Sequence, residues 1–334
     1  MQMTWSIIVN NIKFNNAINR IEQKCPPIWM MRQAGRYQPS YMKIKEQYNF
    51  EQMCKIPEVA AQVAMLPINE FDFDIAIMFS DILWHLEGLG LPIEFAPGPK
   101  FTTHLNEDNW IKYTDVSKAI GHLQFQNQAL SATRDLLPKD KSLIGFVGGP
   151  WSLLNYAVGN NKVSLDFRTT YIEKIIIPLL RLSIKEQKKA GAESVIILDS
   201  GLSNIKSSYF KETYAPMLKS LADVSGVGYY ARGISHKAMT NVSNFNWAGV
   251  GIDSTHDLTQ TLSVFNKGFV QGNFDEKLIV LPHDEFKPHF HNWLDELKDL
   301  DTTGWVCGLG HGIIKETPTD NVKYFVDNIR KHFA

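Results

Sequence analysis

The stretch LIGFVGGPW, residues 143–151, shows the pattern that decides the fold. A short run of apolar residues ends in two glycines, and a segment with helical spacing follows. An apolar run without polar alternation is typical of a strand buried on both faces of a parallel sheet. The same unit recurs along the chain, and the eight predicted strands are residues 28–31, 75–79, 143–147, 194–198, 228–231, 249–252, 269–270 and 305–306.

Helical segments are predicted between these runs. The segment at 167–190 has cations in its last turns and Gly191 just beyond them, as a helix C-terminus prefers, and Pro178 should kink it. The residues Thr317–Pro318–Thr319 form a plausible N-cap region for the last helix. The predicted helices are residues 57–69, 115–137, 167–190, 293–300 and 320–333.

Eight strands alternating with helices predict an α/β fold with a parallel sheet, and eight strands close a (β/α)8 barrel. The alternative is a doubly wound open sheet, which would place a glycine-rich phosphate loop after an early strand. Here RQAGR, residues 32–36, follows the first strand with one glycine and two cations. No linker divides the chain, so we predict a single barrel domain over residues 1–334.

Composition limits the classes of ligand. The chain has 34 Lys plus Arg and 35 Asp plus Glu, a net charge of -1, so it has no general positive field for nucleic acid or an anionic membrane. An anionic ligand would need a local cluster of cations, and Arg32 and Arg36 offer one. Three separated cysteines fit no disulfide framework and favour a reducing cytoplasm. The apolar run at 7–9 is too short for a signal peptide, and no stretch is long enough to span a membrane.

Polar and small residues follow nearly every predicted strand, at the end where barrel enzymes place their active sites. Each also has a simpler interpretation: Arg32 and Arg36 as surface charges, Asp81 as a helix cap, Tyr156 as a packed aromatic and Ser200 as a turn residue. His311 stands between two glycines, which supply no packing for a core histidine. We interpret Asp199 and Asp253 as structural. The candidate site residues are Arg32, Gln33, Ala34, Gly35, Arg36, Asp81, Tyr156, Ser200 and His311.

No metal site is predicted. Cys307 with His311, and His289 with His291, give two ligands each, whereas zinc needs three or four. The two histidines of the second pair lie in a segment that we expect to be exposed. The motifs of P-loop enzymes, of α/β-hydrolases and of HExxH zinc proteases are missing from the sequence.

Seven motifs together resemble the uroporphyrinogen decarboxylase family. They are PIWMMRQAGRY at 27–37, FSDIL at 79–83, GGPWSLLNY at 148–156, LDS at 198–200, VGID at 250–253, QGN at 271–273 and LGHG at 309–312. The resemblance implies a (β/α)8 barrel, a cytoplasmic homodimer with facing clefts, and no metal or organic cofactor. The implied reaction of haem biosynthesis removes CO2 from the four acetates of uroporphyrinogen III, giving coproporphyrinogen III.

The resemblance also implies roles for residues. Arg32 and Arg36, in the segment that holds Gln33, Ala34 and Gly35, would bind substrate carboxylates. Asp81 would hold the pyrrole N–H groups, and Tyr156, Ser200 and His311 would complete the pocket. The ring-protonating group stays open among Arg32 acting through water, Tyr156 and His311.

The chain departs from the family pattern at a few positions. It has DSGLS at 199–203 where the family commonly has DSWAG, so the loop that carries Ser200 differs from the family pattern, and Gly308 and Lys315 also differ. Lys45 could supply a further cation. The alternatives are a zinc-dependent thiol methyltransferase, whose HxC motif is missing from the sequence, and a non-catalytic tetrapyrrole carrier, which would have little need of Asp81.

Overall fold

Seven parallel strands form the central sheet of the computed structural model, which describes residues 10–95 and 98–334. Their order is β1-β4-β5-β6-β7-β8-β9, so each strand pairs with the next one along the chain, as in a β/α barrel. The apolar run at 7–9 lies outside the described residues. The strands are β1 (Ile75–Ile77), β4 (Ser142–Gly148), β5 (Ser194–Asp199), β6 (Val227–Ala231), β7 (Gly249–Gly251), β8 (Phe269–Phe274) and β9 (Trp305–Leu309).

The first predicted strand is reduced to a single bridge that joins the two edges of the sheet. Ile28 pairs in parallel with Cys307 of β9, and the N–H of Asp74, just before β1, donates to the carbonyl of Ile28 at 3.1 Å. Pairing stops there because a turn begins at Met30, whose carbonyl accepts from the N–H of Gln33 at 3.1 Å. The eight predicted strand positions are therefore confirmed, but the first strand is shorter than predicted, and β8 and β9 extend beyond the predicted residues 269–270 and 305–306.

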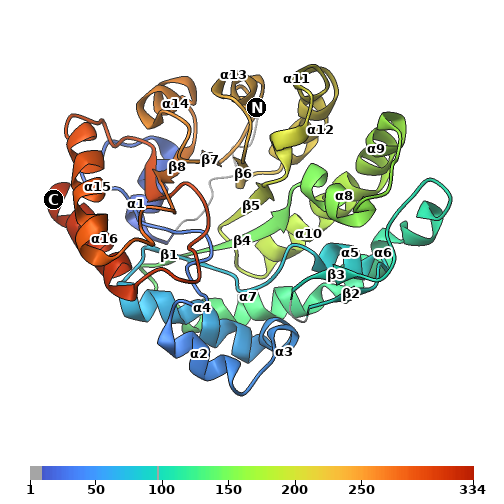
Figure 1. Ribbon diagram of the computed structural model, residues 1–334, viewed down its shortest axis with the longest axis horizontal. Coiled ribbons are helices and arrows are strands. Elements are labelled where there is room, and N and C mark those ends of the chain that lie inside the picture. Colours follow the sequence, from blue (N-terminus) through green and yellow to red (C-terminus); the bar gives the residue numbers. More distant parts are fainter. Residues whose placement is uncertain (1–9, 96–97) are drawn as a thin grey trace.

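Helices surround the strands as an arc on the outside of the sheet (Figure 1). One hydrophobic cluster of buried residues extends from Phe14 to Phe333, and every residue of β4 is buried, as predicted for a strand covered on both faces. In the described part of the chain, the α-helices of four or more residues are α1 (Ile12–Asn19), α2 (Pro39–Lys45), α3 (Phe50–Lys55), α4 (Pro57–Phe71), α5 (Trp84–Gly88), α6 (Val116–His122), α7 (Gln124–Leu136), α8 (Pro150–Val158), α9 (Leu165–Tyr171), α10 (Ile177–Lys189), α12 (Ala215–Ala222), α13 (His236–Met239), α14 (Leu258–Val264), α15 (His283–Glu296) and α16 (Thr319–His332).

Three helix predictions need correction. The segment 115–137 is divided at Leu123 into α6 and α7. The segment 167–190 is α9 and α10 joined by a π-helical turn, η2 (Ile172–Ile176), which lets Pro178 begin a new helix without a lost hydrogen bond. Only the end of α15 was predicted, because Pro288 within it hides the apolar spacing. The helices at 57–69 and 320–333 are confirmed as α4 and α16.

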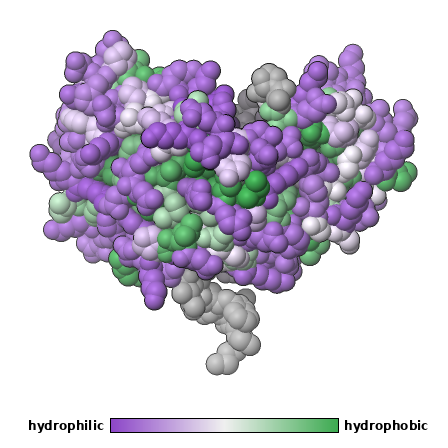
Figure 2. Space-filling model, turned by 90° about the horizontal axis from the view of Figure 1, so that it is seen from below, coloured by the Kyte–Doolittle hydropathy of each residue, from purple (hydrophilic) through white to green (hydrophobic). Residues whose placement is uncertain are grey.

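The surface over α2, α3, α4 and α7 is mostly hydrophilic, with several grouped hydrophobic side chains (Figure 2). A short hairpin, β2 (Ile93–Glu94) with β3 (Lys100–Phe101), was not predicted. All three cysteines are free, as predicted. Within residues 10–95 and 98–334, no helix is both long and apolar enough to cross a membrane.

Candidate active site

The loop RQAGR leaves the sheet through a residue in a left-handed conformation. Arg32 has a φ of 59°, which costs a non-glycine residue about 1–2 kcal/mol, so the surrounding structure must hold it. Gln33 does this from inside: its side chain is fully buried and Nε2 donates to the carbonyl of Ile75 in β1 at 3.1 Å. The hydroxyl of Tyr37 donates to the carbonyl of Gln33 at 2.6 Å. The loop is thus anchored beneath, and Arg32 and Arg36 are exposed above it.

The rest of this loop is held in the same way. The N–H of Gly35 donates to Oε1 of Gln38 at 3.1 Å, and Nε2 of Gln38 donates to Glu70 at 2.9 Å. Ala34 is half-buried against a small cluster that includes Tyr41. Gln33, Ala34 and Gly35 therefore serve the geometry of the loop, and the two arginine side chains are its chemically active part.

The loop after β1 presents Asp81. Its Oδ1 accepts from the N–H of Leu83 at 2.8 Å, which closes a turn ahead of α5, but the N-cap of α5 is Leu83 and no side chain caps it, so the interpretation of Asp81 as the helix cap is wrong. Its other carboxylate oxygen, Oδ2, accepts no hydrogen bond from the residues that the structure describes. Burial raises the pKa of the Asp81 carboxyl, while the Leu83 N–H and the charge of Arg32 oppose that rise. A desolvated carboxylate with a shifted pKa and a specific charged partner is typical of active sites.

His311 approaches the same region from the loop after β9. Its Nδ1 lies 3.0 Å from the hydroxyl of Tyr230, and that hydroxyl lies 2.9 Å from the carbonyl of Gly310. The hydroxyl has one proton, and the carbonyl can only accept it, so the imidazole carries its proton on Nδ1. Burial and the charges of Arg232 and Arg32 lower the pKa of His311 to about 4, so the ring is neutral at pH 7.

The first and last loops of the barrel meet at Arg32. A Cβ on Gly312 would lie 2.5 Å from Cδ of Arg32, so a larger residue there would displace the arginine stem from this position. The N–H of Ile313 donates to the carbonyl of Met31 at 2.9 Å. Arg32, Asp81 and His311, far apart in sequence, are therefore brought to one end of the barrel.

Tyr156 and Ser200 follow the neighbouring strands β4 and β5. Tyr156 lies on α8 with 44% of its surface exposed, so it is not a packed aromatic, and Ser200 is exposed too. The DSGLS segment is tied to α8, because the N–H of Gly201 donates to Oγ of Ser152 at 2.9 Å and Nδ2 of Asn155 donates to the carbonyl of Gly201 at 3.3 Å. These bonds define the loop that carries Ser200.

Asp199 and Asp253 hold their loops in place through hydrogen bonds, in line with the structural role predicted for them. Asp199 is fully buried and accepts hydrogen bonds from Ser152, Tyr214 and Tyr229. Asp253 accepts from the N–H groups of Gly233 and Thr255, from the Thr255 hydroxyl and from His256. Although burial alone would raise it, these bonds lower the pKa of Asp253 well below its ordinary value.

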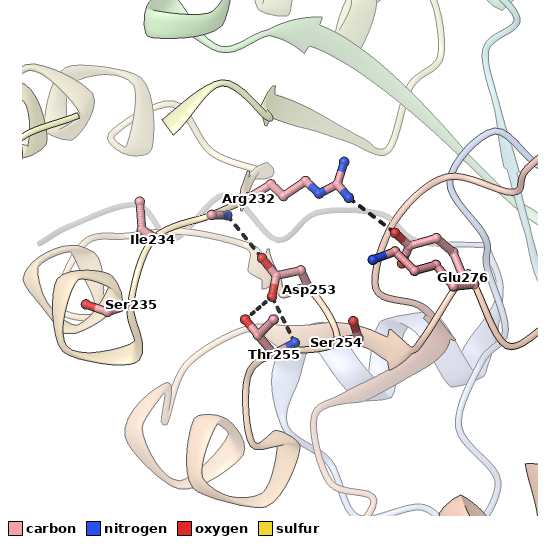
Figure 3. A pocket seen from close by; sticks show the side chains of 9 residues that line it. Arg232, Ile234, Ser235, Asp253, Ser254, Thr255 and Glu276 are labelled. Carbon is pink, nitrogen blue, oxygen red and sulfur yellow. Dashed lines mark hydrogen bonds and ion pairs between the residues drawn. The ribbon is translucent and has the colours of Figure 1, made fainter. Parts of the chain in front are cut away.

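Two further residues lie near the site and are not among the candidates from the sequence. Tyr230, in the apolar run of β6, orients His311. Arg232 points across a cavity toward Glu276 (Figure 3). Successive side chains of a strand alternate between faces, so the pair Tyr229–Tyr230 already required one hydroxyl to face the barrel interior. In the described part of the chain, no group of three or more His, Cys, Asp or Glu side chains is arranged to hold a metal ion. His289 and His291 are exposed on α15, as expected.

The fold and site define a class: a β/α barrel with guanidinium groups, a desolvated carboxylate and a neutral histidine at the carboxyl end of its strands. The family model for uroporphyrinogen decarboxylase matches residues 10–332. Uroporphyrinogen decarboxylases of Neorickettsia sennetsu and Campylobacter jejuni are each 32% identical to the chain, covering 90% and 92% of it and 96% and 95% of their own lengths. The chain belongs to the uroporphyrinogen decarboxylase family.

Solved structures agree on the fold. A methyltransferase from Methanosarcina mazei aligns with a TM-score of 0.76 and 16% identity, covering 98% of this chain and 100% of its own. A B12-independent methionine synthase from a Shewanella strain aligns with a TM-score of 0.57 and 10% identity, covering 93% of this chain and 96% of its own. At these identities the likeness concerns the fold alone.

Proposed function

We propose that the carboxyl end of this barrel is where the chain, a carboxy-lyase of haem biosynthesis, converts uroporphyrinogen III to coproporphyrinogen III. The observation that carries the proposal is the meeting of Arg32, Asp81 and His311 in a chain that matches the family over residues 10–332. The substrate has eight carboxylates, and each turnover removes four as CO2. An anion of that size requires the local cations that a net charge of -1 does not otherwise supply.

The chemistry needs a place for an electron pair. Protonation of a pyrrole ring at its α-carbon gives a cationic iminium, and the ring accepts the electrons left when the neighbouring acetate loses CO2. A proton then adds to the former methylene carbon, and the α-proton leaves, so each acetate becomes a methyl group with a net uptake of one proton. The substrate itself does what an organic cofactor does in other decarboxylases.

Asp81 would stabilise the cation. Its free carboxylate oxygen can accept from pyrrole N–H groups, and a charge pair at ~4 Å and an effective dielectric near 20 is worth about 4 kcal/mol. The burial that raises the pKa of Asp81 also reduces solvent screening of that attraction. Arg32 and Arg36 would bind carboxylates through their planar guanidinium forks.

The protonation state of His311 reduces the number of candidate proton donors. A pKa of about 4, with the Nδ1 proton engaged by Tyr230, leaves this histidine neutral and unsuited to donate a proton in the resting enzyme. Tyr156 and a water molecule held by Arg32 are the remaining candidates, while Ser200 and His311 would position the substrate. A Tyr156→Phe variant separates them, because it removes one hydroxyl and leaves Arg32 untouched.

The direct test is anaerobic incubation with chemically reduced uroporphyrinogen III, followed by separation of the products by carboxylate number. A ladder from eight to four carboxylates is the expected result. Bound but unchanged substrate would instead indicate the carrier. Stoichiometric zinc in the purified protein, together with methyl transfer to a thiol, would indicate the methyltransferase.

We also propose that the catalytic unit spans residues 1–334 and acts in the cytoplasm as a homodimer with facing clefts. The family membership supports this arrangement. Sedimentation of the purified chain at micromolar concentration should give a mass of twice 38.0 kDa. A sedimenting species of 38.0 kDa throughout would contradict the dimer.

A further inference from the structure

A cavity lies after the carboxyl ends of β6, β7 and β8, at the end of the barrel that carries the proposed site (Figure 3). Its volume is about 360 Å³. Arg232 is the first residue after β6, and Glu276 is the second residue after β8. Their ion pair therefore joins two loops across the opening of the cavity. Other residues that line it are Gly233, Ser235, Asp253 and Thr255.

The ion pair across this cavity is loosely made. Nη2 of Arg232 lies 3.3 Å from Oε1 of Glu276, whereas charge-assisted N–H···O bonds are usually about 2.7–2.9 Å long. The Glu276 side chain is 8% exposed and that of Arg232 is 39% exposed. Within the described residues this is the one side-chain bond of the guanidinium, which has five N–H donors. Arg232 therefore retains donors for a second anion.

The carboxylate of Asp253 does not compete for Arg232. Both of its oxygens are used by Gly233, Thr255 and His256, as described above. The charge of Asp253 is therefore balanced by hydrogen bonds from residues of the cavity wall. The carboxylate that a ligand could replace on the Arg232 guanidinium is that of Glu276.

The cavity adjoins the proposed site. The hydroxyl of Tyr230, two residues before Arg232, lies 3.0 Å from Nδ1 of His311, and the charges of Arg232 and Arg32 both lower the pKa of that imidazole. The loop of His311 packs directly against Ser254, a lining residue of the cavity, because a Cβ on Gly310 would lie 2.4 Å from the backbone nitrogen of Ser254. A substrate with carboxylates around its whole edge can therefore reach Arg32 and Arg232 at once.

We propose that Arg232 is a further carboxylate-binding residue, and that Glu276 is an internal counter-ion which a side-chain carboxylate of the tetrapyrrole displaces from it. This subsite rests on the proposed function, since it takes one of the eight carboxylates of that substrate. The guanidinium of Arg232 then neutralises a carboxylate of the substrate in place of that of Glu276. Recognition here adds affinity for the substrate without touching the reacting ring.

The test measures KM and kcat for uroporphyrinogen with Arg232→Met, Arg232→Lys and Glu276→Gln. Arg232→Met should raise KM about tenfold, the size expected for one charge-assisted hydrogen bond, and should change kcat less than twofold. Arg232→Lys should lie between wild type and Arg232→Met. Glu276→Gln should lower KM about threefold, because the guanidinium loses its internal competitor.

The matched control is Glu193→Gln. Glu193 also pairs with an arginine at 3.3 Å, Arg134, and its side chain is 7% exposed, but it precedes β5 at the other end of the barrel. Its KM should equal that of wild type. Repeating the assay with a pentacarboxylate substrate identifies the bound group: a propionate if the KM effect of Arg232→Met persists, an acetate if the effect disappears.

Two results would overturn the subsite: an unchanged KM in Arg232→Met, or a KM that rises in Glu276→Gln as it does in Arg232→Met, which would make the pair a structural unit. Circular dichroism of each variant shows whether it is folded. The wild-type measurement tests the function separately, because a failure to form products there defeats the decarboxylase assignment and leaves the subsite without a substrate.

Discussion

Two aspartates flank β1 and have opposite surroundings. Asp74, just before the strand, has a side chain that is 5% exposed and accepts from the N–H of Ile28 at 2.8 Å, with Lys13 at 3.8 Å and Arg330 at 3.7 Å. Asp81, just after the strand, accepts one backbone hydrogen bond and faces Arg32. The first is paired within the protein, whereas the second is desolvated and partly unpaired.

The same contrast holds for the two ends of the barrel. At the amino end, the cationic side chains are paired with groups of the protein. Lys141 and Arg330 form ion pairs with Asp72. Arg134 donates to Glu193 and to three backbone carbonyls. At the carboxyl end, Arg32 and Arg36 are exposed. Removing one partner of a paired charge leaves the other uncompensated and destabilises the fold, whereas an incompletely paired charge is available to a ligand.

The largest effect should come from Asp81→Ala. Removing a preorganised group that stabilises developing charge typically costs about 100- to 1000-fold in kcat, and we expect that loss for uroporphyrinogen turnover. Because Asp81 makes one hydrogen bond in the free protein, the melting temperature should change little. Near-wild-type kcat in this variant would remove Asp81 from the mechanism.

Asp74→Ala should show the reverse behaviour. The backbone N–H of Ile28, which helps to close the barrel, would lose its buried acceptor, so we expect unfolding in urea to become easier by about 3 kcal/mol. The kcat of the folded fraction should equal that of wild type. A variant that keeps its stability but loses kcat would contradict the division between the two ends.

The third prediction concerns pH. The folded-state pKa of His311 lies at about 4, below the ordinary 6.5, so the unfolded chain binds more protons between these values and stability falls as pH decreases through that range. His311→Gln should lose this dependence, flattening the urea stability profile between pH 7 and 4.5 by about 2 kcal/mol.

Buried His85, whose pKa burial also lowers to about 4, contributes equally to both proteins, so the difference between them isolates His311. Exposed His289 provides the control, and His289→Gln should keep the wild-type slope. Identical slopes for His311→Gln and wild type would show that the imidazole is not held neutral by its surroundings.

The smallest effect should come from Arg36→Lys. A point charge replaces a bidentate fork, so we expect KM to rise about three- to tenfold with kcat retained. Arg134→Lys is the matched change at the amino end, where it should lower stability and leave KM unaltered. An unchanged KM in Arg36→Lys would support the simpler interpretation of Arg36 as a surface charge.

Strand positions were predictable because a strand buried on both faces needs a continuous apolar run, and seven of the eight runs became paired strands. The break at Leu123 and the π-helical turn before Pro178 were not, because helix continuity depends on packing against neighbours as well as on spacing. The candidate residues Arg32, Asp81 and His311 could be chosen because each lies in the segment that follows an apolar run. Tyr230 could not be assigned a role, since its partner His311 is 81 residues away.

By itself the sequence determined the barrel class, the family and the end of the sheet where the polar residues gather, because these depend on local patterns and motifs. Only the tertiary structure decided the chemical state of each group. Burial and neighbouring charges raise the pKa of Asp81 and lower that of His311, and they distinguish Asp74 from Asp81 and Arg134 from Arg232. The physical reason is that desolvation and Coulomb interactions act through space, between residues that the chain brings together only when it folds.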